Sequence, residues 1–166
     1  MPEQNTKIQS RKKDRSMSAR FDIYQVMKLV PQGFKLLGEL DAYTKSTDLD
    51  PKLRELVKFR ASQINGCVYC LSYHAADARK LGESEMRLYC LSAWEESHLY
   101  SEMEKAALEL TEHVTLLPSL KVPDHVYQKV RKYFSETQYI NLTMLIMMIN
   151  SWNRLSIAMG FTPEAE

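Results

Sequence analysis

Two cysteines and one histidine lie in a single short stretch, at spacings that suit thiol chemistry. Cys67 and Cys70 are three residues apart, and His74 follows the second cysteine by four residues. Asn65-Gly66 favours a turn just before them, so a new helix is expected to begin there. On that helix the three side chains share an arc of about 100°, the width of a core-facing stripe. The same arc carries Leu71, Ala78 and Leu81, and the opposite side carries Tyr69, Tyr73, Ala76 and Lys80.

The first turn of a helix favours the anionic form of a thiol. Free backbone N–H groups and the positive end of the helix dipole lower the pKa of a thiol there and populate the nucleophilic thiolate. His74 lies one turn beyond Cys70, where it can exchange a proton with either sulfur. A spacing of three also lets two sulfurs approach closely enough to bond. Oxidation of one thiolate to sulfenic acid, resolved by the second thiol, would complete a two-cysteine redox cycle.

Two other interpretations use the same residues. Zinc could bind Cys67, Cys70 and His74, but a tetrahedral site needs a fourth ligand and the sequence has no second cysteine pair. The remaining histidines are isolated from one another: His98, His113 and His125. The three residues could also be packing residues of a core, which is the interpretation that we give to Cys90.

The bulk composition predicts one soluble globular domain. The chain has 166 residues, of which 45% are hydrophobic and 26% charged. It has no apolar run of about 20 residues, as a membrane span would need, and no secretory signal. Three cysteines, an odd number, fit a reducing compartment better than a secreted disulfide framework, so a cytoplasmic protein is expected.

A basic leader is expected to precede the domain. Residues 1–20 hold six basic and two acidic residues. We interpret residues 1–18 as a flexible, solvated leader and residues 19–166 as the domain. The leader has no aromatic residue to stack on bases, so neither a nucleic-acid partner nor a membrane partner is predicted.

Helical signals dominate the domain, and strand signals are weak. Capping residues and prolines place the expected helices, and the fold class is therefore all-α with about seven helices, the cysteine pair opening a central one. The expected ranges are 31–46, 51–65, 67–81, 85–94, 102–117, 124–134 and 136–159. The last is apolar around nearly its whole circumference from Ile140 to Met159, which predicts a central helix, a subunit interface or both. Its polar residues would need partners if buried: Asn150, Ser151, Asn153 and Arg154.

One segment resembles a known family. "ELVKFRASQINGCVYCLSYHAADARKLGESEMRLYCLSAW" is similar to the core of the AhpD-like alkylhydroperoxidases, within the carboxymuconolactone decarboxylase superfamily. The pieces that carry the likeness are Glu55, "RASQINGCVYC", His74 and "GESEMRL", and "INSWNRLSIA" resembles the peroxidase-related branch. The resemblance covers roughly residues 21–161, and it implies an all-α fold that assembles as a trimer or hexamer.

The resemblance also implies residue roles. Cys70 would be the peroxidatic cysteine, Cys67 the resolving cysteine and proton donor, and Glu55 with His74 a proton relay. AhpD has another relay histidine where this chain has Tyr69. Without the family, Glu55 would be interpreted as a solvated residue, because it lies opposite the apolar face of its helix. In the family role its face must be covered, and the last helix is a candidate cover.

The function expected from the resemblance is a thiol-dependent peroxidase. A peroxide would oxidise the Cys67/Cys70 pair, and an external dithiol of the lipoyl or thioredoxin type would restore it. Neither a cofactor nor a metal is expected, since no haem, flavin or nucleotide motif is found among only five glycines. Two alternatives stay open: a general disulfide reductase, and a non-redox enzyme of the decarboxylase type that uses Glu55 and His74 as acid and base.

Overall fold

The computed structural model describes residues 18–163, and within that range every regular element is helical. The all-α prediction is confirmed, and two short helices add to the seven or so expected: α2, which ends two residues before Pro31, and α8, which has Pro118 as its second residue. The predicted leader, residues 1–18, lies outside the described residues except for its last position. The elements are α2 (Ile23–Leu29), α3 (Pro31–Ser46), α4 (Pro51–Asn65), α5 (Val68–Lys80), α6 (Glu85–Cys90), η1 (Leu91–Ala93), α7 (Glu102–Thr115), α8 (Leu117–Leu120), α9 (Asp124–Arg131) and α10 (Glu136–Met159).

The helix starts follow the capping residues of the sequence. The Asp50 side chain accepts a hydrogen bond from the backbone N–H of Leu53 at 2.9 Å, just before Pro51 opens α4. Ser101 and Ser135 each form a complete capping box at the starts of α7 and α10. These local bonds satisfy N–H groups that a helix start leaves without an intrahelical partner, so they fix where each helix begins.

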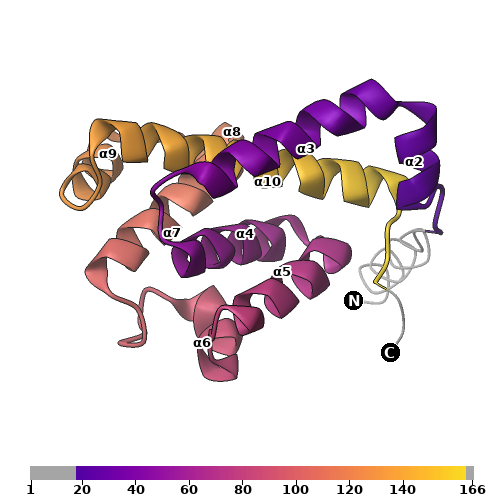
Figure 1. Ribbon diagram of the computed structural model, residues 1–166. Helices are drawn as coiled ribbons and strands as arrows, with labels where there is room; N and C mark the ends of the chain where they lie inside the picture. The colour runs from indigo at the N-terminus through magenta and orange to yellow at the C-terminus, as the bar shows by residue number, and fades with distance from the viewer. Residues whose placement is uncertain (1–17, 164–166) are drawn as a thin grey trace, which may run out of the picture.

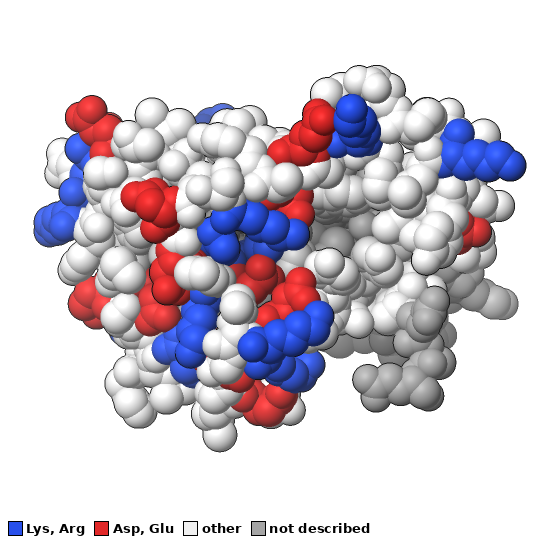
Figure 2. All heavy atoms as spheres, in the orientation of Figure 1, with Lys and Arg blue, Asp and Glu red and all other residues white. Residues whose placement is uncertain are grey.

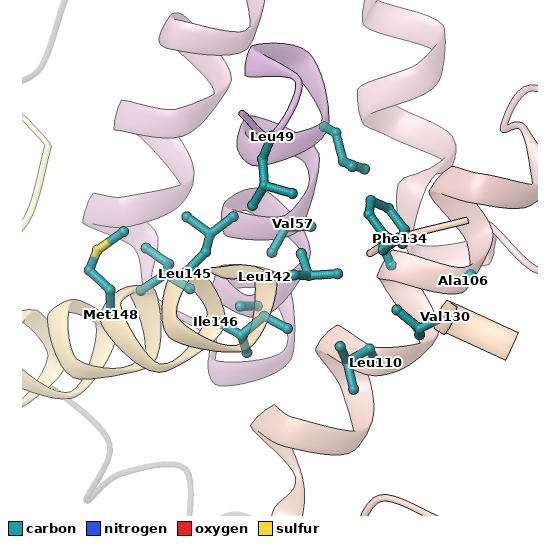
Figure 3. Close-up of a cluster of buried hydrophobic side chains, with 14 of the residues drawn as sticks. Leu49, Val57, Ala106, Leu110, Val130, Phe134, Leu142, Leu145, Ile146 and Met148 are labelled. Atoms are coloured by element: carbon teal, nitrogen blue, oxygen red, sulfur yellow. The ribbon is translucent and has the colours of Figure 1, made fainter. Parts of the chain in front are cut away.

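Helix α4 lies at the centre of the fold. In Figure 1, α3 and α10 run above it, α5 and α6 lie below it, and α7 lies at one end. Its Leu53, Val57 and Ala61 join a cluster with α7, α9 and α10, part of which Figure 3 shows around Val57. Its Leu56 belongs to a second cluster with α5, α6 and α7. Because other helices pack against α4 on several sides, polar and charged side chains of α4 can be buried as well as apolar ones.

The last helix is buried along most of its surface but not all of it. Leu142, Leu145 and Ile146 are fully buried against α4. Ile140 and Met147, by contrast, are 59% and 51% exposed in the single chain. One face of α10 is therefore packed in the core, as expected of a central helix, and the other face carries an exposed apolar stripe.

A buried amide network ties the end of α4 to α10. The side-chain N–H₂ of Asn65 donates to the Oδ1 atoms of Asn150 and Asn153, at 2.9 and 2.8 Å. Asn153 in turn donates to the Ser62 hydroxyl at 3.0 Å, and Asn150 donates to Thr115 at 3.0 Å. These bonds supply the partners that the buried asparagines of the last helix needed. They also fix the chain immediately before the cysteine pair.

Charged side chains of both signs gather over one part of the surface (Figure 2). Several form ion pairs, among them Arg87, which bonds to Glu83 and Glu104. Among the described residues, no helix combines the length and the apolar character that a membrane span requires.

Two glycines that end helices give a matched stability test. Gly66 and Gly160 both have positive φ, 69° and 75°. A Cβ on Gly66 would meet nothing within 4 Å, whereas one on Gly160 would lie 2.6 Å from the backbone oxygen of Ser18. We expect Gly66→Ala to lower the free energy of unfolding by about 1–2 kcal/mol, the ordinary cost of a left-handed residue. Gly160→Ala should lower it further, because backbone must also move. Urea denaturation measures both, and equal losses would contradict the prediction.

Candidate active site

The cysteine pair lies at the start of α5, as expected. Gly66 ends α4 in the left-handed conformation, and Cys67 is the N-cap residue of α5. The Cys67 sulfur accepts a hydrogen bond from the backbone N–H of Cys70 at 3.3 Å. The two cysteines have Cα atoms 5.3 Å apart, are joined by a disulfide and are both buried. Since Val68 is the first helical residue, both sulfurs lie in the first turn, where the backbone favours a thiolate once the disulfide is reduced.

His74 pairs with Glu55 across the α4–α5 interface. Nδ1 of His74 lies 2.9 Å from Oε2 of Glu55, and both side chains are buried. The interpretation of Glu55 as a solvated residue is therefore wrong. The cover comes from α5, which packs along this side of α4, while α10 packs on the face that carries Val57. The sequence pattern missed this because it assumed that α4 has only one buried face.

A third charged residue, which the sequence pattern did not indicate, completes this group. Lys58 is only 1% exposed, and its Nζ lies 2.5 Å from Oε1 of Glu55. In the sequence the two residues form an ordinary i,i+3 pair, which is common on solvated helix faces. The one sequence signal for Lys58 was its position three residues after Glu55, the glutamate to which the family resemblance assigns a role. Only the burial of both partners distinguishes it from a surface pair.

The environment of Glu55 keeps its carboxyl group ionised. Burial alone raises the pKa of Glu55, but the hydrogen bond with His74 and the charge of Lys58 outweigh it, so that the pKa is lowered overall. An ionised carboxylate only accepts hydrogen bonds, so Nδ1 of His74 must be the donor. In the neutral ring this leaves Nε2 as the nitrogen that can take up a proton. The pair therefore fixes the tautomer of a histidine suited to general acid–base chemistry.

A partly open cavity of about 170 Å³ lies beside these residues. One wall comes from α5 and another from α10, where the lining residues recur every four positions. In Figure 2 the surface is hollowed between α3 and α5, with charged side chains of both signs along one side of the hollow and uncharged residues along the other. The lining residues are Ile23, Asp41, Tyr69, Cys70, Tyr73, His74, Met148, Trp152 and Ser156. Cys70 lines the cavity, whereas Cys67 is not among its lining residues.

The expected orientation of α5 needs two corrections: Leu81, expected on the buried arc, is 40% exposed, and two tyrosines expected on the opposite side line the cavity. Cys67, Cys70, His74 and Ala78 are buried as predicted, but Tyr69 and Tyr73 also line the cavity. They were expected to lie away from the reactive face. The cavity lies along the flank of α5 rather than directly over its buried stripe, so a second row of side chains reaches it. Tyr69, in the place of the AhpD relay histidine, thus contributes an aromatic ring beside Cys70.

The groups that could hold a metal ion do not match the zinc site considered from the sequence. A disulfide offers no pair of thiolates, so Cys67 and Cys70 cannot serve as two zinc ligands in this form. Among the described residues, Glu55, His74 and Asp77 place ligand atoms within 4.8 Å of one another. The ammonium group of Lys58, however, already neutralises Glu55 at 2.5 Å. A cation at this position would face its positive charge.

Comparisons with known proteins agree with this architecture. The model of the carboxymuconolactone decarboxylase family matches residues 30–113. The uncharacterised protein YdfG of Bacillus subtilis is 51% identical over 144 residues, which cover 87% of this chain and 96% of YdfG. The uncharacterised protein YnjA of Escherichia coli is 30% identical over 120 residues, 72% of this chain and 65% of YnjA.

Solved structures show the same fold. The crystal structure of ATU0492 from Agrobacterium tumefaciens superposes with a TM-score of 0.85 at 32% identity, covering 90% of this chain and all of the other. That protein is described as having an unknown function and as a candidate antioxidant defence protein AhpD. The family model, the relatives and the fold lead to one conclusion: the chain belongs to the carboxymuconolactone decarboxylase family, in its AhpD-like part.

Proposed function

We propose that this protein is a thiol-dependent peroxidase that reduces peroxides through Cys67 and Cys70. The observation that carries the proposal is the disulfide-linked pair in the first turn of α5, with Cys70 in the wall of a cavity that His74 also lines. A bare pair of nearby cysteines would be a weak argument. The added support is the Glu55–His74 hydrogen bond, which supplies an oriented acid–base group to the same cavity.

The reaction begins with the reduced pair. His74 takes the proton of the Cys70 thiol, and the thiolate attacks the outer oxygen of the peroxide ROOH. An S–O bond forms and the O–O bond breaks. The leaving alkoxide takes the proton from His74 and becomes an alcohol. The Cys67 thiol then attacks the sulfenic acid on Cys70, which forms the disulfide and releases water. The peroxide is thereby reduced by two electrons, and the cysteine pair is oxidised by two.

An external dithiol closes the cycle by thiol–disulfide exchange and leaves as its own disulfide. A lipoyl-type or thioredoxin-type donor is proposed on family resemblance. A homo-oligomer, a trimer or a hexamer, is proposed on the same ground. The exposed apolar side chains of α10, Ile140 and Met147, support an interface between copies.

Mass spectrometry of trapped thiols tests the oxidation step. After full reduction and removal of the reductant, one equivalent of peroxide should remove the free thiols of Cys67 and Cys70 and create a peptide cross-linked between them. Cys90, the free cysteine of the described residues, is the internal control and should still be alkylated. Finding both Cys67 and Cys70 still alkylated after peroxide treatment would sink the proposal.

The Glu55–His74 pair also supports a second candidate, acid–base chemistry of the decarboxylase type. At 2.9 Å the pair would orient a base without any help from the cysteines. Loss of carbon dioxide from a lactone carboxylate by a Cys67→Ser/Cys70→Ser chain would favour this candidate. Reduction of disulfides without any reaction with peroxide would instead favour a general disulfide reductase.

A further inference from the structure

The carboxylate of Glu55 has a separate partner on each of its two oxygens. Oε1 pairs with Nζ of Lys58 at 2.5 Å, and Oε2 lies 2.9 Å from Nδ1 of His74. All three side chains are buried, and Lys58 is the most deeply buried of them at 1% exposure. His74 lines the cavity that holds Cys70, whereas Lys58 does not. The chain of contacts from Lys58 to the cavity therefore runs through Glu55 and His74.

Stability is a poor explanation for a lysine in this place. Lysine is among the residues least often fully buried. Short-range lysine pairs usually lie in water, as Lys35 and Glu39 do on α3. A buried ion pair often stabilises a protein no more than apolar side chains of similar volume, because both charges must be withdrawn from water. The ammonium group of Lys58 is therefore expected to serve the acid–base group that it contacts.

The charge of Lys58 decides which way the hydrogen bond between Glu55 and His74 runs. Burial raises the pKa of Glu55, and the hydrogen bond with His74 and the charge of Lys58 outweigh this effect only together. Without the ammonium group, burial favours a protonated carboxyl, whose O–H is a donor. That O–H would donate to Nδ1, and the neutral ring would carry its own proton on Nε2. Such a ring has no nitrogen left to accept the proton of a thiol.

Other charged groups around this cluster are already paired with one another. The titratable side chains of α3 and α5 that surround it are Asp41, Lys45, Tyr73, Asp77 and Lys80. The two lysines among them form ion pairs with the two aspartates, at 2.6 Å on α3 and 2.7 Å on α5. Among the described residues, no lysine or arginine other than Lys58 forms an ion pair with Glu55. The ammonium group of Lys58 therefore has no substitute in contact with this carboxylate.

We propose that Lys58 is a positioning residue of the Cys70 reaction. Its ammonium group holds Glu55 as a carboxylate, so that His74 donates from Nδ1 and keeps Nε2 free to take the proton of the Cys70 thiol. The lysine keeps its own proton throughout and acts through Glu55. This inference rests on the proposed peroxidase function, because it adds a residue to the acid–base group of that reaction.

Nitrogen NMR of the histidine rings tests the direction of the hydrogen bond directly. The full chain is labelled with nitrogen-15 histidine and kept in its disulfide form, and the signals of His74 are assigned by their loss in His74→Gln. In the neutral wild-type ring we expect the proton on Nδ1. In Lys58→Met, which replaces the lysine by an uncharged side chain of similar length, we expect it on Nε2. A wild-type ring with its proton on Nε2 overturns the inference, whether or not the variant folds.

The rate of Cys70 oxidation tests the consequence for the reaction. With reduced protein and tert-butyl hydroperoxide as the probe, Lys58→Met should lose the Cys70 thiol about a hundredfold more slowly than wild type, the effect of a lost general base. Lys58→Arg retains the charge and should be faster than Lys58→Met. Lys129→Met is the matched control, because it also breaks a lysine–glutamate pair, with Glu109 at 2.7 Å, but outside the cavity. Its rate should equal that of wild type. Equal rates for wild type and Lys58→Met overturn the inference.

The pH dependence separates a positioning role from a loss of structure. In Lys58→Met, a rise in pH ionises the buried carboxyl of Glu55, and the ionised carboxylate again requires the proton on Nδ1 of His74. The ratio of the wild-type rate to the variant rate should therefore fall as the pH is raised from neutral. A variant that is slow only because its structure is loosened would give a constant ratio, which contradicts the proposed role.

The inference and the proposed function fail in different ways. If peroxide links Cys67 to Cys70 in the wild type, but neither the tautomer of His74 nor the oxidation rate depends on Lys58, the inference is overturned and the proposed function stands. If the wild-type cysteine pair does not react with peroxide, the proposed function is overturned, and the role of Lys58 in that reaction falls with it.

Discussion

Replacing Cys70 with serine should abolish peroxide turnover, whereas replacing Cys67 should stop the reaction after one oxidation. Cys70 lines the cavity, and a serine hydroxyl in its place is not ionised near neutral pH. The rate should therefore fall by roughly three orders of magnitude or more. Cys67 is buried as the N-cap residue, with its sulfur accepting the N–H of Cys70. Without it, Cys70 can still be oxidised but its sulfenic acid cannot be resolved within the chain.

The two variants are distinguished by what they trap. Cys67→Ser treated with peroxide and then dimedone should carry one adduct, on Cys70. Cys70→Ser should carry none, and Cys90→Ser should turn over at the wild-type rate because Cys90 lies on α6, outside the cavity. An adduct on Cys67 of the Cys70→Ser protein, with turnover retained, would show that the two roles are reversed.

The sequence predicted the local elements well because their signals are local. Asp50, Ser101 and Ser135 bond to backbone N–H groups three residues away, so the sequence alone contains both partners. The same holds for the cysteine pair, whose turn at Gly66 and helix start need no distant contact. For these features, all the groups that interact lie within a few residues of one another in the sequence.

The parts of the site that could not be predicted depend on tertiary packing. Burial converts the i,i+3 pair of Glu55 and Lys58 from a surface feature into part of the site, and Glu55 meets His74 of α5 there. Whether Tyr69 reaches the cavity depends on where α10 crosses α5, which no pattern within α5 encodes. The family resemblance assigned Glu55 to the site, whereas the apolar pattern of its own helix predicted a solvated side chain.

The strongest stability effect is expected at the buried Glu55–Lys58 pair. Glu55→Gln leaves the Lys58 ammonium 1% exposed without a carboxylate, since no other acidic partner for it lies among the described residues. Breaking a buried pair on one side typically lowers the free energy of unfolding by about 3–5 kcal/mol. Lys35 and Glu39 supply the control, because their pair is exposed on both sides. Glu39→Gln should change the free energy by no more than about 0.5 kcal/mol.

A second substitution separates loss of the pair from loss of the glutamate alone. Glu55→Gln/Lys58→Met removes both buried charges and should recover most of the stability, because replacing a buried ion pair by apolar groups is often nearly neutral. Urea denaturation of Glu55→Gln, of Lys58→Met and of the double variant gives the coupling energy. If the double variant is as unstable as Glu55→Gln, the Lys58 charge is not what makes that substitution costly.

The same pair predicts a dependence on pH with a definite sign. The pKa of Glu55 is lowered from its ordinary value of 4.5, so as the pH falls the unfolded chain takes up a proton at this residue before the folded chain does. The stabilisation is therefore complete above the unfolded value and is lost as the pH falls through the folded one. The difference in stability between wild type and Glu55→Gln should be largest near neutral pH and shrink below 4.5. A difference that grows on acidification would mean that Glu55 is protonated in the folded protein, and Lys58 would then have no anion to neutralise it.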